Sequence, residues 1–158
     1  MLRVATEADA DALGDVMHDA VRRGPSRYTE AQRAAWMPAP RRGPDWTARL
    51  ARQHVVLDAA PDGGPDGIRG FMSLEDGAYI DFAYIRPAYQ GTGLFRALFA
   101  AIHAEAERRG GRVLRTHASL MAEPAFAAVG FAVVTRETVE LGGEAFARAE
   151  MTMRLRSA

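Results

Sequence analysis

Two glycines lie close together in residues 86–96, in the segment Arg-Pro-Ala-Tyr-Gln-Gly-Thr-Gly-Leu-Phe-Arg. This segment joins an apolar, aromatic run at 79–85, typical of a strand, to an amphipathic run at 94–109, typical of a helix. Glycines let the backbone turn several N–H groups toward one point, and the helix start adds free N–H groups and a positive dipole end. The chemistry expected of the loop is the binding of a phosphate or pyrophosphate.

Two common nucleotide-binding loops do not match this segment. A P-loop ends in Gly-Lys-Ser/Thr, whereas Gly93 is followed by Leu94 and the chain contains no lysine. A dinucleotide fingerprint needs a third small residue and a downstream acidic residue near a second strand. Arg96 occupies the third position, and Arg-Arg-Gly-Gly-Arg follows the helix instead. A structural turn without a ligand stays the alternative.

Few other side chains suit proton transfer. Asp81 lies within an aromatic strand, where a carboxylate is unfavourable unless it has a partner or a function. Strand alternation places it on the face of Tyr79 and Ala83. His117 ends the strand expected at 113–117, and its ordinary pKa suits proton exchange at neutral pH. The alternative for His117 is a surface or core histidine.

Composition narrows the class of protein. The chain has 158 residues, 48% of them hydrophobic, and we expect one domain over residues 1–158. The absence of cysteine excludes disulfides, thiolate metal sites and a cysteine nucleophile, and no metal-ligand cluster is visible. A net charge of zero argues against nucleic acid or an anionic membrane as a partner. Without a signal segment or an 18-residue apolar run, we expect a cytoplasmic protein.

Turn and cap signals divide the chain into alternating strands and helices. Thr6 with Asp9, and Thr29 with Gln32, have the spacing of helix N-caps. A parallel strand pair is expected where the long helix links two strands. The expected strands are 2–5, 54–58, 68–75, 79–85, 113–117, 131–141 and 144–154; the expected helices follow Thr6, Thr29 and Gly43 and cover 94–109 and 123–128; turns are expected at 61–67, 76–77 and 142–143.

This order of elements resembles the GNAT superfamily of N-acetyltransferases, and the resemblance covers nearly the whole chain. The glycine loop is similar to the acyl-CoA loop of that superfamily, Arg/Gln-x-x-Gly-x-Gly/Ala: Gln90 and Gly93 match, and Phe95 departs from the last small position. Residues 118–131, which end in Gly-Phe, resemble the superfamily's strand, short helix and Gly-Phe block. The segment 28–36 and the Ala-Ser-Leu at 118–120 resemble one bacterial branch of loosely assigned acetyltransferases.

The resemblance implies a mixed α/β fold of the GNAT type. It would have a mostly antiparallel mixed sheet of six to seven strands, one parallel pair at the cofactor cleft, and four to five flanking helices. It also implies acetyl-CoA as the acyl donor, with its pyrophosphate on the loop and its pantetheine arm paired with the backbone at 83–85. The implied cofactor-binding residues are Ala83, Tyr84, Ile85, Gln90, Gly91, Thr92, Gly93, Leu94, Phe95, Arg96, Ser119 and Phe126.

The implied activity is transfer of an acetyl group to a primary amine by direct attack in a ternary complex. The tyrosine that often protonates the leaving thiolate in the superfamily is replaced here by Phe126, which cannot donate a proton. A strand bulge, usual in the superfamily, would turn Asp81 with Tyr84 toward the cleft. The candidate catalytic residues are Asp81, His117 and Tyr84, and the candidate acceptor-binding residues are Tyr28, Trp36 and Asp81; Trp46 is an alternative wall or a core residue.

Several choices stay open at this stage. Ser119 could bond the pantetheine arm or cap the next helix, and Arg86 and Arg96 could contact the ribose phosphate or lie in solvent. A non-catalytic acyl-CoA-binding or sensor module of the same fold is the main alternative, and a phosphate- or nucleotide-binding domain of another kind is the third. The acceptor is a peptide or small-molecule amine, and the edge of the C-terminal hairpin would permit a homodimer.

Overall fold

The computed structural model describes residues 1–61, 67–76 and 78–156. The turns expected at 61–67 and 76–77 therefore lie partly outside the described residues. The elements are β1 (Leu2–Val4), α1 (Ala10–Arg23), α2 (Glu30–Trp36), α3 (Pro44–Ala51), β2 (His54–Ala59), β3 (Ile68–Glu75), β4 (Tyr79–Ile85), α4 (Leu94–Arg108), β5 (Val113–Ser119), α5 (Glu123–Ala128), β6 (Ala132–Leu141) and β7 (Glu144–Arg154).

Local signals place the helix starts correctly. Thr29 Oγ1 accepts a hydrogen bond from the Gln32 N–H (3.1 Å), and Gln32 Oε1 accepts one from the Thr29 N–H (2.7 Å), which is the expected capping box. The strand expected at 113–117 runs two residues further, to Ser119, because its antiparallel pairing with β7 continues to Arg148. His117 therefore lies inside this strand and does not end it.

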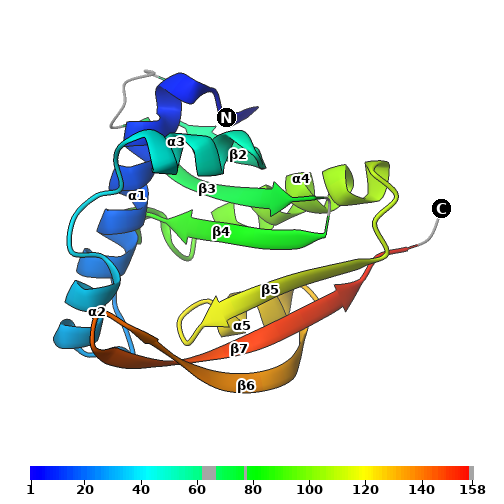
Figure 1. The fold of residues 1–158 in the computed structure, drawn as a ribbon. Helices are drawn as coiled ribbons and strands as arrows, with labels where there is room; N and C mark the ends of the chain where they lie inside the picture. The colour runs from blue at the N-terminus through cyan, green and yellow to red at the C-terminus, as the bar shows by residue number, and fades with distance from the viewer. Residues whose placement is uncertain (62–66, 77, 157–158) are drawn as a thin grey trace.

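The strands form one mixed sheet in the order β1-β2-β3-β4-β5-β7-β6. Every neighbouring pair is antiparallel except β4 and β5, which are parallel, as expected. Their pairing covers only Tyr79 with Arg115 and Ile80 with Thr116, and beyond this point the two strands diverge (Figure 1). The sheet is therefore split into two halves at its centre.

A bulge in β4 decides which way its side chains point. Met72 of β3 pairs with Ala83, but Leu74 pairs with Ile80, so β4 holds one extra residue opposite Ser73. The buried Ser73 Oγ accepts a hydrogen bond from the Phe82 N–H (2.9 Å) there. Asp81 and Phe82 consequently both face α3, and Ala83 packs on the opposite side of the sheet. The bulge expected for this strand is therefore present: alternation holds from Tyr79 to Asp81 and fails at Ala83.

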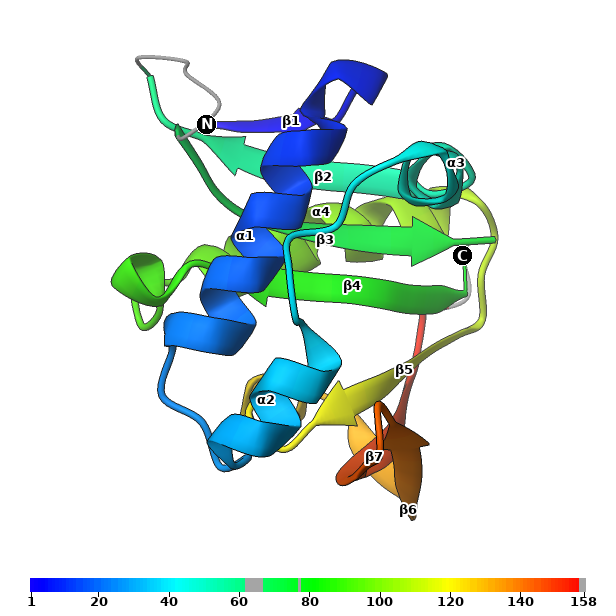
Figure 2. The ribbon, with the colours of Figure 1, turned by 60° about the vertical axis from the view of Figure 1, so that its left-hand side comes forward.

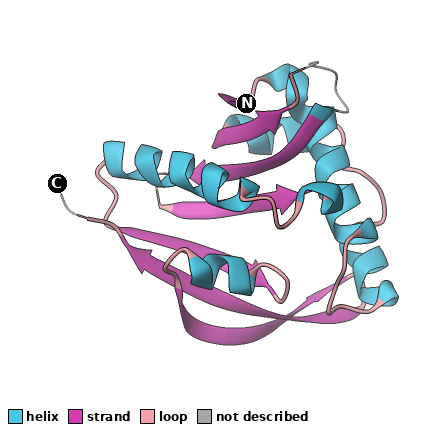
Figure 3. Cartoon of the chain, turned by 180° about the vertical axis from the view of Figure 1, so that it is seen from behind, coloured by secondary structure: helices cyan, strands magenta, loops and turns pink. Residues whose placement is uncertain are grey.

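Helices cover both faces of the sheet. α1, α2 and α3 lie on one face (Figure 2), where Leu13, Val16 and Met17 pack against the strands. α4 and α5 lie on the other (Figure 3), where Leu98, Phe99 and Ile102 fill the core. The central strands are therefore covered on both faces, whereas most of β6 is exposed. Among the helices that the structure describes, none has the length and apolarity needed to cross a membrane.

Candidate active site

The glycine loop follows β4 through a short 3-10 turn at Pro87–Tyr89. Gly91 (φ +75°) and Gly93 (φ +86°) both adopt left-handed backbone conformations, and no atom lies within 4 Å of where a Cβ would stand. The Thr92 hydroxyl donates to the Tyr89 carbonyl (2.5 Å) and closes the turn. A side chain at either glycine would be strained by its φ and would project into open space beside the loop.

The backbone N–H groups of residues 91–96 are free of partners in the described chain where the sequence predicts an anion site. None of the six donates a hydrogen bond to another residue of the described chain, and the first helical bond of α4 runs from the Ala97 N–H to the Gly93 carbonyl. Free N–H groups at the start of a 15-residue helix attract an anion through hydrogen bonds and through the helix dipole. The loop is therefore suited to a pyrophosphate.

The end of β4 offers a free backbone edge to the split. The Arg86 N–H donates to the Arg69 carbonyl of the neighbouring chain segment. Since the backbone groups of successive residues in a strand point in opposite directions, those of Tyr84 also point toward β3. The backbone groups of Ala83 and Ile85 point the other way, into the gap where β5 has diverged. Gln90 Nε2 caps the Ile85 carbonyl (3.2 Å). An extended chain could add to this edge as a further strand.

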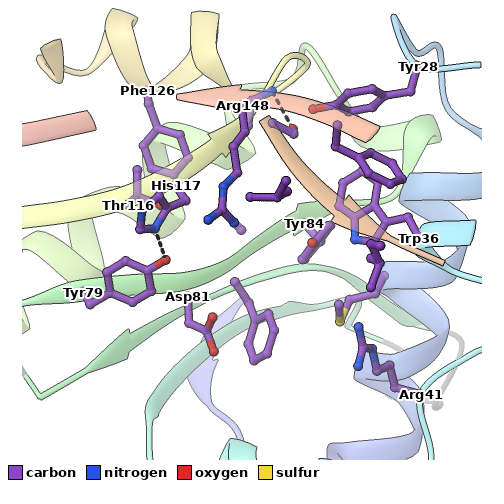
Figure 4. A pocket seen from close by; sticks show the side chains of 18 of the residues that line it. Tyr28, Trp36, Arg41, Tyr79, Asp81, Tyr84, Thr116, His117, Phe126 and Arg148 are labelled. Carbon is purple, nitrogen blue, oxygen red and sulfur yellow. Dashed lines mark hydrogen bonds between the residues drawn. The ribbon is translucent and has the colours of Figure 1, made fainter. Parts of the chain in front are cut away.

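Two cavities meet at the split. The larger, of about 460 Å³, runs from the glycine loop along the free edge of β4. The smaller, of about 250 Å³, lies on the side of α1 and contains the polar side chains shown in Figure 4. Both cavities are lined by Trp36, Ala83, Tyr84, Ser119 and Ala122. Molecules held in the two cavities would therefore touch at this boundary.

A histidine and a tyrosine form the hydrogen-bonded pair of the smaller cavity. The Tyr79 hydroxyl and His117 Nδ1 are 2.6 Å apart (Figure 4), and His117 Nε2 lies 3.6 Å from a carboxylate oxygen of Glu137. In the tautomer with its proton on Nε2, on the side of the Glu137 carboxylate, the imidazole accepts a hydrogen bond from the Tyr79 hydroxyl at Nδ1. Burial and then the charge of Arg148 lower the pKa of His117, so the ring is neutral at pH 7. A neutral histidine can accept a proton.

Residues 30–155 match the family described as the acetyltransferase (GNAT) domain. The chain belongs to this family. A solved GCN5-related N-acetyltransferase from Rhodopseudomonas palustris, also described as a class-II aminotransferase, is 30% identical, with 98% of this chain and 95% of that chain covered and a TM-score of 0.86.

Two more distant GNAT structures were solved with acetyl-CoA. They are yncA from Salmonella typhimurium, at 22% identity, 100% and 95% coverage and a TM-score of 0.66, and a phosphinothricin acetyltransferase from Sinorhizobium meliloti, at 18% identity, 98% and 88% coverage and a TM-score of 0.69. At these identities they show a shared fold alone. No curated protein matches the chain.

In this GNAT domain Asp81 is bound by its neighbours. Arg49 donates to both carboxylate oxygens through Nε (3.0 Å) and Nη2 (2.9 Å), and Gln53 Nε2 adds a third bond (2.7 Å). Arg49 also stacks over the Phe82 ring, with 4.6 Å from its guanidinium carbon to the ring centroid. These three hydrogen bonds occupy both oxygens of the carboxylate and fix the position of Arg49.

Tyr84 lies at the boundary between the two cavities, and Phe126 lines the smaller cavity alone. Burial raises the pKa of Tyr84, so its hydroxyl stays protonated and can donate a hydrogen bond. Phe126, in the position of the superfamily tyrosine, is 2% exposed and packs edge-on against Phe95 and Phe131, each with 5.1 Å between ring centroids. Ser119 Oγ accepts from the Ala122 N–H (3.2 Å), so the serine does cap the next helix while lining both cavities.

Aromatic residues form one wall of the smaller cavity. Tyr28, Trp36 and Phe146 stack edge to face, with ring centroids 5.5–6.2 Å apart. The Tyr28 hydroxyl donates to the Ala147 carbonyl (2.6 Å) and accepts from the Leu120 N–H (3.0 Å). Both of its hydrogen-bonding roles are therefore taken by the backbone. Trp46 is buried and donates to the Ala10 carbonyl (2.8 Å), which makes it a core residue.

The two arginines at the ends of the glycine loop, Arg86 and Arg96, have different surroundings in the structure. Arg86 bonds to Asp19 (3.1 Å) and to the Ile68 carbonyl (2.7 Å), so it supports the fold. Arg96 lines the larger cavity beside the glycine loop.

Sequence reasoning did not select Tyr79, Arg41, Arg148 or Glu137 for the site. Tyr79 lies two residues before Asp81 and on the same face, which strand alternation could have shown. The other three come from a loop and from the C-terminal hairpin, and no local pattern marks them.

Proposed function

We propose that this GNAT domain transfers an acetyl group from acetyl-CoA to a primary amine by direct attack in a ternary complex. The observation that supports this most is the meeting of two cavities at the split between β4 and β5. One cavity ends on the anion-binding loop, and the other ends on a neutral histidine. Such an arrangement suits a reaction between two bound molecules.

The residues that line the larger cavity suit the separate parts of acetyl-CoA. The N–H groups at 91–96 would bind the pyrophosphate, and the free edge at Ala83 and Ile85 would pair with the pantetheine arm. Arg96 lines the same cavity and would contact a phosphate. Acetyl-CoA supplies an activated thioester carbonyl at the boundary with the smaller cavity.

The reaction forms a nitrogen–carbon bond and breaks the carbon–sulfur bond, so the amine must lose a proton and a thiolate must leave. His117, with the Tyr79 hydroxyl on its Nδ1, is placed to receive the amine proton through that hydroxyl, which passes its own proton to Nδ1 and takes up the proton of the amine. The Tyr84 hydroxyl donates a hydrogen bond where negative charge develops at the boundary. The thiolate can leave unprotonated because thiols have a pKa of about 8.5. Asp81 positions Arg49 at the wall of the acceptor cavity.

The test measures thiol release from acetyl-CoA with a panel of primary amines. His117→Gln and Asp81→Asn should each lower kcat at least tenfold while the dissociation constant for acetyl-CoA stays within about threefold, because neither residue lines the larger cavity. His18→Gln is the control, since His18 lies on α1 and lines neither of these cavities. An equal loss of turnover and cofactor binding would make Asp81 a structural residue.

Phe126 favours a second function, a non-catalytic acyl-CoA-binding or sensor module. Its ring cannot protonate a leaving group, and the fold would still bind the cofactor. Saturable acetyl-CoA binding without thiol release on any amine would support this module. Binding of ATP but not of any CoA species would support neither and would indicate a different nucleotide-binding role.

A further inference from the structure

The smaller cavity carries more positive than negative charge. Three arginines line it, Arg41, Arg49 and Arg148, and one carboxylate, Asp81. Asp81 is paired with Arg49 at 2.9 Å, and Arg148 Nε is paired with Glu137 at 2.8 Å. These two ion pairs leave the guanidinium of Arg41 as the excess charge.

Arg41 has no partner of its own. Within the described residues no carboxylate lies at salt-bridge distance from its guanidinium and no acceptor bonds to it. Its charge nevertheless acts on the site, because it opposes the rise in the pKa of Tyr84 that burial causes. Figure 4 shows the Arg41 side chain at one end of the cavity, near Trp36 and Tyr84. A half-buried cation beside an apolar wall favours an anionic ligand.

The backbone that carries Arg41 is held in a defined place. Its carbonyl oxygen packs directly on Gly14 of α1, where an added Cβ would overlap it. The next residue, Arg42, bonds to the Asp11 carbonyl (3.1 Å) and to the Asp15 carboxylate (2.6 Å). Glycine inside a helix lowers the free energy of unfolding by about 1 kcal/mol relative to alanine. This close approach of the Arg41 carbonyl therefore requires a residue that is unfavourable in the helix. The backbone of Arg41 is therefore fixed against α1, and its side chain lines the cavity.

We propose that the acceptor is a small primary amine that also carries a carboxylate, as amino acids do, and that Arg41 binds this carboxylate. The inference rests on the proposed acetyl transfer. The aromatic wall of Tyr28, Trp36 and Phe146 would contact the carbon skeleton between the two polar groups. A polyamine would bring a second positive charge toward Arg41 and should bind poorly.

A series of unbranched amines tests the inference. The ω-amino acids from glycine to 6-aminohexanoate are compared with n-alkylamines and α,ω-diamines of the same length, by thiol release from acetyl-CoA. We expect kcat/KM for the best amino acid to exceed that of its alkylamine at least tenfold, and diamines to be the poorest. The chain length of the best amino acid then reports the spacing between the amine and carboxylate subsites.

Substitutions then assign the effect to Arg41. Arg41→Gln should reduce the ratio of amino acid to alkylamine kcat/KM to about one, and Arg41→Lys should retain part of it. Arg112→Gln, an exposed arginine in the turn before β5 that lines neither cavity, should keep the full ratio. Acetyl-CoA affinity shows that each variant is folded.

Two outcomes would overturn the inference in different ways. Alkylamines or diamines that react as well as amino acids, with no change of ratio in Arg41→Gln, would remove the carboxylate subsite and leave acetyl transfer intact. Acetyl-CoA binding with no thiol release on any amine would overturn the proposed function and the acceptor class with it.

Discussion

At the scale of a single residue, substitution of Gly93 tests whether the glycine loop binds acetyl-CoA. Its φ of +86° means that Gly93→Val strains the loop, and because Gly93 lines the larger cavity, the added bulk lies at that cavity beside the free N–H groups. We expect the dissociation constant for acetyl-CoA to rise at least tenfold, about 1.4 kcal/mol. Calorimetric titration measures it, and circular dichroism shows whether the domain is folded.

Gly110 provides the matched control for this substitution. It has a φ of +78° and nothing within 4 Å of a Cβ, but it lies after the far end of α4. Gly110→Val should cost similar backbone strain, of order 1–3 kcal/mol, and leave acetyl-CoA affinity unchanged. Equal weakening in both variants, or normal affinity in a folded Gly93→Val protein, would contradict the assignment of the loop.

His117 sets the expected dependence of activity on pH. Its pKa is lowered in the folded protein, first by burial and then by Arg148, so the neutral base persists below pH 6.5. As pH falls through this lowered pKa, the ring gains a proton and kcat/KM should fall tenfold per pH unit. NMR titration of the histidine rings measures the pKa, and Arg148→Gln should move it upward. An acidic limb retained in His117→Gln would assign the titration to another group.

The contact between α1 and the Arg41 loop gives a prediction at the scale of the element. In most helices Gly→Ala stabilises by up to about 1 kcal/mol, but Gly14 faces the Arg41 carbonyl oxygen, which belongs to the backbone and cannot turn away. Gly14→Ala should therefore destabilise the domain by about 1–3 kcal/mol in urea unfolding and should also raise KM for the acceptor. A gain of stability would show that the loop moves freely.

Elements were predictable where a local signal marks them, and side-chain directions were not. The caps at Thr29 and Thr6, the glycine loop and the Gly142-Gly143 hairpin depend on neighbouring residues, and the structure confirms them. The bulge after Asp81 depends on Ser73 of another strand, so alternation holds for Tyr79 and Asp81 and fails for Ala83. Glu137 approaches His117 from β6, two strands away in the sheet order, and that relation requires the whole topology.

At the scale of the whole molecule, few contacts bridge the split. The two-residue pairing of β4 with β5 and the Thr116 hydroxyl bond to the Ile80 carbonyl (2.9 Å) hold one end. At the other end, the Tyr28 hydroxyl ties the segment before α2 to Ala147 and Leu120. Tyr28→Phe should cost about 1–3 kcal/mol in urea unfolding because both partners lose their bond. Tyr89→Phe, at an exposed tyrosine, should cost less than 0.5 kcal/mol, about the usual limit for surface sites.

Acetyl-CoA should strengthen this bridge when it binds. An arm that pairs with the free edge at Ala83 and Ile85 would occupy the space between the two halves of the sheet, while the pyrophosphate would cover the N–H groups at 91–96. At a hundred times its dissociation constant the ligand should add about 2.7 kcal/mol to the free energy of unfolding. Hydrogen exchange measured on the complex should slow at both 83–85 and 91–96. Protection of the loop alone would mean that a phosphate group binds there without the pantetheine arm lying along β4. That result would contradict the placement of acetyl-CoA between the two halves of the sheet.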